Sequence, residues 1–120
     1  MKHILIVEDD PNAAFILQRQ LNKLGILTSV TTNLFYILSK VKEGMVDAIT
    51  LDLQLPEIPG HEIIKHVRVE HPHIPIIVIT AQASEETRVK YLELGASYFL
   101  TKPYYPADLN RIIKNLLLEK

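Results

Sequence analysis

The apolar positions of this chain follow two alternating patterns. Short runs of Ile, Leu and Val recur along the sequence, and longer stretches between them carry apolar residues at every third or fourth position. The first pattern is typical of buried strands, and the second is typical of helices with one buried face. The runs predict strands at residues 3–7, 27–31, 48–53, 74–80 and 98–101.

Residues that begin and end helices lie between these runs. Asp10 directly precedes Pro11, and an acidic cap followed by proline is a common helix start. Asn33 and Ser84 are expected to cap two further helices. Isolated glycines mark the helix ends, because glycine readily adopts the left-handed conformation found there. The helices are expected to run from Pro11 to Gly25, from Asn33 to Lys42, from His61 to Glu70, from Ser84 to Gly95, and onward from Pro106.

The order of elements predicts an α/β fold. Five strand–helix units follow one another, and the strands are apolar almost throughout. Such strands need a helix layer on both faces of the sheet, so we expect a doubly wound five-stranded parallel sheet with five helices. The chain shows no internal repeat or linker, and residues 1–120 are expected to form one domain.

Composition narrows the function classes. The chain is 48% hydrophobic, has a formal net charge of −1 and contains no cysteine. This charge gives no gross bias toward nucleic acid or an anionic membrane surface. No apolar run approaches the length of roughly 18 residues that a membrane span requires. We therefore expect a cytoplasmic domain that binds neither membrane nor nucleic acid directly.

Polar residues follow or end four of the predicted strands. Glu8 and Asp9 follow the first strand, Asp52 lies on the third, Thr80 ends the fourth and Lys102 follows the fifth. In a parallel sheet the carboxyl ends of the strands lie along one edge, and ligands bind there. The three carboxylates, the hydroxyl and the ammonium should therefore converge. Such a set can hold a divalent cation and receive a phosphoryl group.

Clustered carboxylates repel one another, and a hard cation such as Mg²⁺ relieves this repulsion. Asp52 is the better candidate for a nucleophile that forms an aspartyl phosphate, because it stands alone on the central strand. Glu8 and Asp9 would then hold the metal. A plainer alternative is that an acid at a strand end only caps the next helix, which is the preferred interpretation for Asp10. A lone Lys102 is usually just solvated, and a lone Thr80 usually bonds to backbone.

Several longer motifs carry a family resemblance. They are ILIVEDD, LDLQLPEIPG, IIVITA, LGASYFLTKP and YYPADL. Over essentially its full length, the chain resembles the receiver domain of two-component response regulators. The resemblance implies a flavodoxin-like fold. It also implies that Asp52 accepts a phosphoryl group from a sensor histidine kinase or a phosphotransfer protein.

The resemblance further assigns roles around Asp52. It implies that Mg²⁺ binds to Glu8, Asp9, Asp52 and the backbone carbonyl of Gln54, and that Lys102 contacts the phosphoryl group. It also implies a cis peptide bond before Pro103.

The same resemblance implies a signalling switch. Thr80 and Phe99 would form the switch pair, relaying the change at Asp52 to a face made by the fourth helix, fifth strand and fifth helix. Tyrosines are expected to supply aromatic contact area on that face, namely Tyr91, Tyr98, Tyr104 and Tyr105.

The chain departs from the subgroup of the family that dimerises through salt bridges. Ser97, Tyr98 and Ile112 stand where that subgroup carries charges. Ile112 could instead be core, since it is in phase with Leu109 and Leu116. We therefore expect a monomer or weak homodimer that binds an output protein of unknown identity.

Two alternatives to a phosphorylated switch remain open. One is a degenerate receiver that serves as a constitutive docking module. The other is a metal-dependent phosphatase, although Gln54 stands where such an enzyme would need a second aspartate. We expect a phosphoacceptor regulator and not an enzyme. The histidines do not have the spacing of a helical zinc site, and this applies to His61, His66, His71 and His73.

Overall fold

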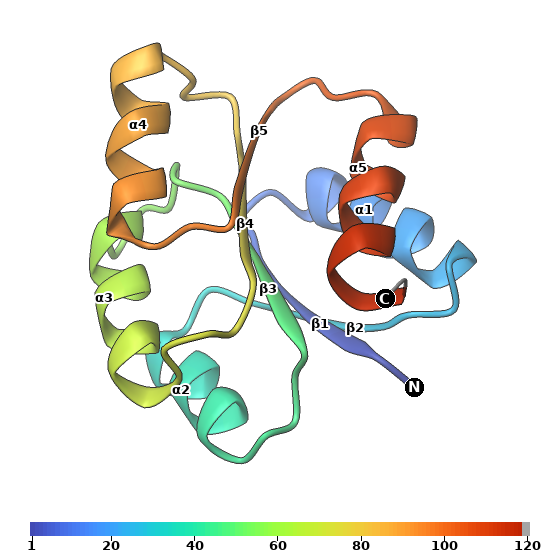
Figure 1. Cartoon of the computed structure of the whole chain (residues 1–120), viewed down its shortest axis with the longest axis horizontal. Coiled ribbons are helices and arrows are strands. Elements are labelled where there is room, and N and C mark those ends of the chain that lie inside the picture. Colours follow the sequence, from blue (N-terminus) through green and yellow to red (C-terminus); the bar gives the residue numbers. More distant parts are fainter. Residues whose placement is uncertain (119–120) are drawn as a thin grey trace.

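A computed structural model describes residues 1–118 and confirms the predicted α/β fold. Five strands form a single parallel sheet in the order β2-β1-β3-β4-β5 (Figure 1). The strands are β1 His3–Val7, β2 Leu27–Thr31, β3 Ala48–Leu51, β4 Ile76–Thr80 and β5 Tyr98–Thr101. The helices are α1 Pro11–Lys23, α2 Leu34–Lys42, α3 Gly60–Glu70, α4 Glu85–Leu94 and α5 Pro106–Ile113, and a π-helical turn, Lys114–Leu118, continues α5.

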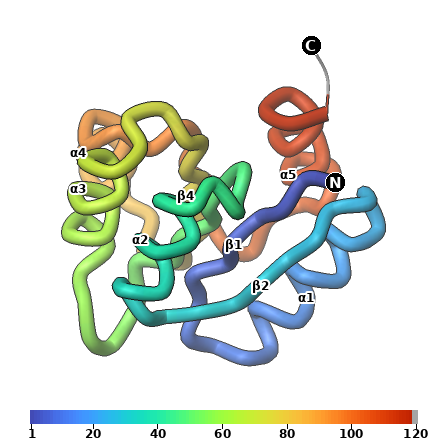
Figure 2. The backbone as a smooth tube through the Cα atoms, turned by 90° about the horizontal axis from the view of Figure 1, so that it is seen from below, coloured from blue at the N-terminus to red at the C-terminus, as the bar shows by residue number. Residues whose placement is uncertain are grey.

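The helices form two layers, one on each face of the sheet. α1 and α5 cover one face, while α2, α3 and α4 cover the other (Figures 1 and 2). Successive strand residues point to opposite faces. Ile4 and Ile6 of β1 accordingly pack with α1 and α5. Leu5 and Val7 pack with the other layer. The alternation explains why the strands are apolar at nearly every position.

The strand order places a crevice at one edge of the sheet. The chain moves outward from β1 to β2 and then returns to the other side of β1 to form β3. The connections that leave β1 and β3 therefore diverge, and a ligand site is expected between their carboxyl ends. Glu8 follows β1 and Asp52 follows β3, so the topology brings these two acids to the crevice.

The predicted helix caps are confirmed. The Asp10 side chain accepts a hydrogen bond from the Asn12 amide, and Asn33 accepts one from the Tyr36 amide. Ser84 accepts one from the Thr87 amide. These side chains satisfy amide groups that the first turn of a helix leaves without partners.

Several element boundaries differ from the sequence prediction, most clearly those of two strands. β3 ends at Leu51 and not at residue 53, because the Asp52 carboxylate accepts the Gln54 amide and turns the chain. β4 begins at Ile76 and not at residue 74, since Pro75 has no N–H to contribute to the sheet. α3 begins at Gly60, one residue before its predicted start.

The expectation that Tyr91 lies on an exposed output face is wrong. Tyr91 is only 7% exposed and packs into the core beneath α3 and α4. The rest of α4 is mainly polar, and Tyr91 is its one buried residue. Ile112 is also core, at 5% exposure, as its phase with Leu109 indicates. Within residues 1–118, no helix has both the length and the apolar character needed to cross a membrane.

Candidate functional site

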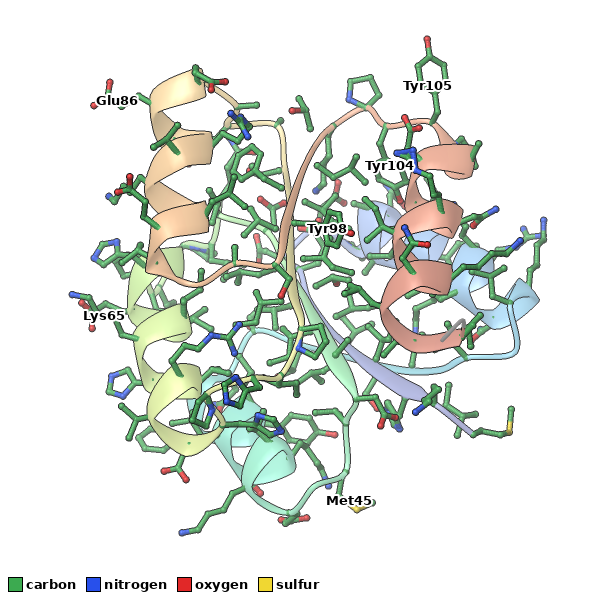
Figure 3. The ribbon with its side chains drawn as sticks, in the orientation of Figure 1. Met45, Lys65, Glu86, Tyr98, Tyr104 and Tyr105 are labelled. Carbon is green, nitrogen blue, oxygen red and sulfur yellow. The ribbon has the colours of Figure 1, made fainter. Side chains whose placement is uncertain are left out.

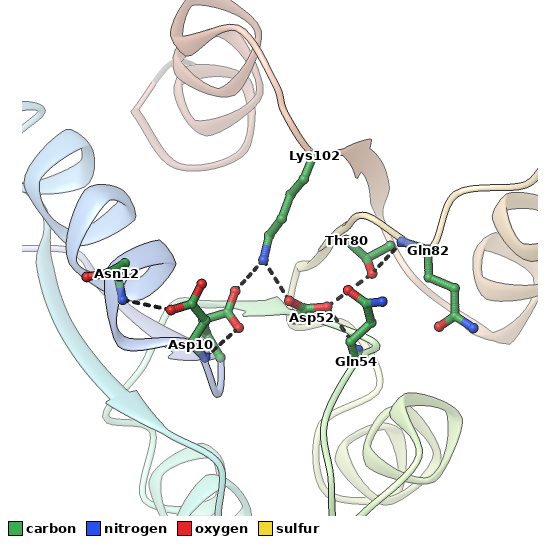
Figure 4. A network of polar contacts seen from close by, with 8 residues as sticks. Asp10, Asn12, Asp52, Gln54, Thr80, Gln82 and Lys102 are labelled. Atoms are coloured by element: carbon green, nitrogen blue, oxygen red, sulfur yellow. Dashed lines mark hydrogen bonds and ion pairs between the residues drawn. The ribbon is translucent and has the colours of Figure 1, made fainter.

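Asp52 lies at the centre of a polar network at the carboxyl edge of the sheet. Its backbone amide donates to the Val7 carbonyl over 3.0 Å, which joins the end of β3 to β1. Its side chain is almost entirely buried and accepts three hydrogen bonds (Figure 4). The donors are the Gln54 amide at 2.9 Å, the Thr80 hydroxyl at 3.0 Å and the Lys102 ammonium at 2.6 Å. A buried carboxylate with this many donors is fixed in position and remains charged.

Lys102 joins the two buried acids. Its ammonium contacts Asp52 and also forms an ion pair with Glu8. Its backbone amide donates to the Thr80 carbonyl over 2.9 Å, so the lysine is held at the end of β5. The Lys102–Pro103 peptide bond is cis, as the family resemblance implies. A single cation therefore faces two carboxylates.

The ionisation of this pair follows from its surroundings. Burial acts to raise the pKa of Asp52, but hydrogen bonds from Lys102 and Gln54 outweigh it, so the pKa falls below its ordinary value. Burial acts to lower the pKa of Lys102, but its contacts with Asp52 and Glu8 outweigh that effect and raise the pKa. Both groups are therefore charged at neutral pH.

Thr80 lies beside Asp52 as predicted. The residue is fully buried, and its hydroxyl donates to Asp52 while accepting the Gln82 amide over 3.1 Å. The hydroxyl thus connects the carboxylate to the loop that follows β4. Phe99 is half-buried and packs against the core cluster that contains Tyr91. The two predicted switch residues therefore lie on neighbouring strands, since Thr80 pairs with Thr101 at the end of β5.

The predicted metal ligands are divided between the buried network and the surface. Glu8 is 8% exposed and accepts the Asp10 amide, whereas Asp9 is exposed. Among residues 1–118, no three acidic or histidine side chains are already arranged around a common metal position. The oxygen donors at this edge nevertheless fit a hard cation, because Glu8 and Asp52 face the same ammonium and Gln54 adjoins them. The ligand roles of Asp9 and Gln54 stay predictions.

A cavity of about 450 Å³ opens above the network. Its floor includes Glu8, Asp52 and Lys102, while Ile16 and Tyr104 belong to its apolar walls. Neither wall residue was predicted from the sequence to belong to the site. Ile16 offered a signal, since it is apolar but lies off the buried face formed by the other apolar residues of α1.

Comparisons with known proteins agree with this geometry. A family model described as the response regulator receiver domain matches residues 4–114. The alkaline phosphatase synthesis transcriptional regulatory protein PhoP of Bacillus subtilis is 34% identical over 97% of this chain and 48% of its own length. The response regulator SaeR of Staphylococcus aureus is 32% identical over 98% of this chain and 51% of its own length.

A solved structure is similar over nearly the whole chain. It is the receiver domain of a sensor histidine kinase from Pseudomonas aeruginosa PAO1, described as having a magnesium ion coordinated in its active site cleft. Its TM-score is 0.84, its identity is 28%, and the match covers 96% of each chain. The present chain spans about half the length of the curated relatives it matches. It belongs to the response regulator receiver domain family.

Proposed function

We propose that Asp52 is the phosphoacceptor of a signalling switch and takes its phosphoryl group from a sensor histidine kinase or a phosphotransfer protein. The observation that carries this proposal is the setting of the Asp52 carboxylate. It is nearly buried, held ionised by Lys102, and open to the cavity above it. A fixed anionic oxygen beside a cation is suited to attack phosphorus.

The transfer forms a bond between an Asp52 oxygen and phosphorus and breaks the bond between phosphorus and the donor's histidine nitrogen. The imidazole leaves with the electron pair of that bond and takes up a proton. Lys102 and Thr80 already contact Asp52, so their ammonium and hydroxyl can reach the oxygens of the transferred group. Their hydrogen bonds would stabilise the charge that spreads over these oxygens.

Glu8, Asp9, Asp52 and the Gln54 carbonyl would hold Mg²⁺ at this edge. When bound, the ion neutralises charge on the phosphoryl oxygens. Lys102 forms ion pairs with both Glu8 and Asp52. These two carboxylates can therefore turn toward a bound Mg²⁺ while Lys102 still neutralises part of their negative charge.

Thr80 and Phe99 would relay phosphorylation to the face formed by α4, β5 and α5. A phosphoryl group adds charge and acceptor oxygens close to the Thr80 hydroxyl. If that hydroxyl leaves its present partners, Asp52 and the Gln82 amide, the loop after β4 is released. Phe99 packs beneath α4 and can respond to that release.

The domain would act on its own Asp52 and not on an external substrate. Incubation with acetyl phosphate and Mg²⁺ should label the chain, and Asp52→Asn should abolish labelling. Equal labelling of both proteins would move the site to another residue. No labelling of the wild type would favour a degenerate receiver, and turnover of an external phosphate ester would favour a phosphatase.

The metal assignment has a matched pair of variants. Asp9→Asn should weaken Mg²⁺ binding at least tenfold, because a carboxylate ligand becomes a neutral amide. Asp10→Asn makes the same change one residue later, at a position that caps α1 and where asparagine also caps well. Magnesium titration followed by NMR should therefore separate the two variants. Equal affinities would remove Asp9 from the metal site.

A further inference from the structure

β2 is an outer strand of the sheet and leaves one edge unpaired. Within residues 1–118, β1 is its only neighbour, and the two strands pair over their full length without a bulge (Figure 2). Successive residues of a strand turn their backbone N–H and C=O groups to opposite sides, so an edge strand leaves every second residue without a partner strand. The outer edge of β2 can therefore accept one more strand.

The residues that face this edge are Thr28 and Val30. The Leu27 amide donates to the Lys2 carbonyl over 2.9 Å, so Leu27 directs its backbone groups toward β1. The alternation then directs the backbone groups of Thr28 and Val30 away from β1. Within the described residues, neither of them forms a backbone hydrogen bond outside the sheet. Each therefore presents a donor and an acceptor at the edge.

β2 lacks the features that usually prevent pairing at an exposed edge. Proteins block such edges with charged side chains, proline or bulges. The sequence of β2, LTSVT, contains neither a charged residue nor a proline. Its apolar side chains meet water, since Leu27 is 48% exposed and Val30 is 40% exposed. The edge thus combines unpaired backbone groups with apolar area.

Two polar side chains of β2 already have partners within the chain. On the α1 side of the sheet, the Gln18 side-chain amide donates to the Thr28 hydroxyl over 3.1 Å. On the other side, the Ser29 hydroxyl lies 2.8 Å from His3 Nε2. An incoming strand would therefore pair with the backbone of β2 without having to satisfy these side chains.

We propose that β2 pairs with β2 of a second copy of the chain, antiparallel and about a two-fold axis at Ser29. In this register Thr28 of one copy lies opposite Val30 of the other, so every outward donor and acceptor of β2 finds a partner. The occupant of the edge must itself have an unpaired strand, and a second copy supplies one of equal length. Because β2 carries no charge, the two strands do not repel each other.

The side chains beside the edge complement this pairing. Leu27 and Ser29 lie on the same face of β2, and a hollow of about 90 Å³ adjoins Ser29 on that face. Tyr36 and Met45 belong to its walls. In the antiparallel pair, Leu27 of the second copy lies diagonally across from Ser29, within reach for a long side chain. That leucine would cover the hollow and lose part of its contact with water.

The pairing should be weak and independent of Asp52. β2 has five residues and is about 17 Å long, which is small beside the roughly 1,200–2,000 Å² that stable interfaces bury. β1 separates β2 from β3, the strand that Asp52 follows. Pairing at this edge therefore needs neither phosphorylation nor Mg²⁺, and it assigns a location to the weak homodimer expected from the sequence.

The test measures association across a hundredfold range of chain concentration that reaches the millimolar range. In sedimentation velocity, the average mass should rise with concentration. In NMR spectra of the ¹⁵N-labelled chain, the amide signals of Thr28 and Val30 should move more than those of other strands, because their N–H groups gain partners. Asp52→Asn should associate like wild type, which separates this proposal from the phosphoacceptor assignment.

Two edge variants and a matched control locate the contact. Val30→Lys brings two ammonium groups close together across the pair and should weaken association at least tenfold. Val69→Lys makes the same change on α3, where Val69 is 81% exposed, and should associate like wild type. Thr28→Pro removes an outward N–H at a position where an edge strand tolerates proline, and it should also weaken association at least tenfold. Thermal unfolding checks that each variant folds.

Three outcomes would overturn the proposal. The first is a wild-type chain that stays monomeric at every concentration, which would leave the edge to a strand of another protein. The second is a set of concentration-dependent signal shifts that maps away from β2. The third is equal association of Val30→Lys and Val69→Lys.

Discussion

At the scale of single residues, the site depends on how a buried carboxylate is kept charged. Burying an unpaired carboxylate costs several kcal/mol, so a buried acid needs donors on each oxygen. Oδ1 of Asp52 accepts the Thr80 hydroxyl and the Gln54 amide, and Oδ2 accepts Lys102. The groups that keep Asp52 ionised are thus the groups positioned around any phosphoryl group placed on it.

This arrangement predicts how stability depends on pH. The pKa of Asp52 is lower in the folded chain than in the unfolded chain, where it is about 4. Its ionisation therefore stabilises the fold above about pH 4, and this contribution is lost as the pH falls through the folded pKa. Urea unfolding between pH 6 and pH 3 should show a steeper loss of stability for wild type than for Asp52→Asn. Parallel curves would show that Asp52 gains no net stabilisation from its partners.

The site could be predicted from sequence only in part. Strand ends placed Glu8, Asp52, Thr80 and Lys102 at one edge, and the structure brings these four together. Side-chain direction was not predictable in the same way. Asp9 is adjacent to Glu8 and also carries a carboxylate, yet Glu8 is buried and Asp9 is exposed. Which of two neighbouring acids turns inward depends on how the chain leaves β1, and hydrophobic pattern does not encode that.

At the scale of elements, features that depend only on residues close in sequence were predicted correctly. The caps Asp10, Asn33 and Ser84 act within three residues of themselves, so they were predictable. The burial of Tyr91 was not predictable, because it depends on a contact with an element that is distant in sequence. Its ring packs against the start of α3, and a Cβ on Gly60 would lie 3.4 Å from its hydroxyl.

Arg68 shows a second contact between distant elements. Its guanidinium donates to the carbonyls of Ile74 at 2.8 Å, Gly95 at 2.6 Å and His71 at 3.3 Å. These carbonyls belong to the turn before β4 and to the turn between α4 and β5. Gly95 has a φ of +118°, and a Cβ there would lie 3.0 Å from Arg68 Nε. The absence of a side chain at Gly95 therefore lets the arginine approach and permits the left-handed turn.

Arg68→Met should destabilise the fold by about 2–4 kcal/mol, because it leaves partly buried carbonyls without donors. Arg68→Lys should recover only part of this loss, since one ammonium cannot reach three carbonyls in a planar arrangement. Urea unfolding measures both variants. Arg88→Met is the control, because Arg88 is exposed and pairs with the exposed Glu85 in the preceding turn, and it should show no measurable change. Equal stability of all three variants would contradict the bridging role.

The predicted switch acts between two strands and can be tested at that scale. Thr80→Ala should leave Asp52 open to beryllofluoride but uncouple Phe99, because it removes the hydroxyl and keeps the nucleophile. Thr80→Ser keeps the hydroxyl and is the matched control. Aromatic NMR signals of Phe99 should respond to beryllofluoride and Mg²⁺ in wild type and Thr80→Ser only. An equal response in Thr80→Ala would show that Phe99 senses Asp52 by another route.

At the scale of the whole molecule, the tyrosines of the proposed output face differ in how much of their surface is exposed. Tyr105 is 77% exposed, while Tyr98 and Tyr104 are half-buried and pack on the α1–α5 side (Figure 3). Of the four tyrosines expected to supply contact area, Tyr105 therefore offers the most. From Glu85 to Lys90, every residue of α4 except Thr87 is exposed, so a partner that binds there meets mainly polar side chains.

From these surfaces we predict that activation lets the domain bind a different protein and does not change its oligomeric state. Ile112 is buried and Arg111 already pairs with Asp108, so α5 offers little charge for a salt-bridged dimer. Sedimentation velocity should give a monomer, or a weak dimer, with and without beryllofluoride and Mg²⁺. Tyr105→Ala should leave that result unchanged but weaken binding of the output protein, because a large exposed aromatic is a favoured interface anchor. A tight activated dimer that survives Tyr105→Ala would contradict both the expected stoichiometry and the assignment of this face.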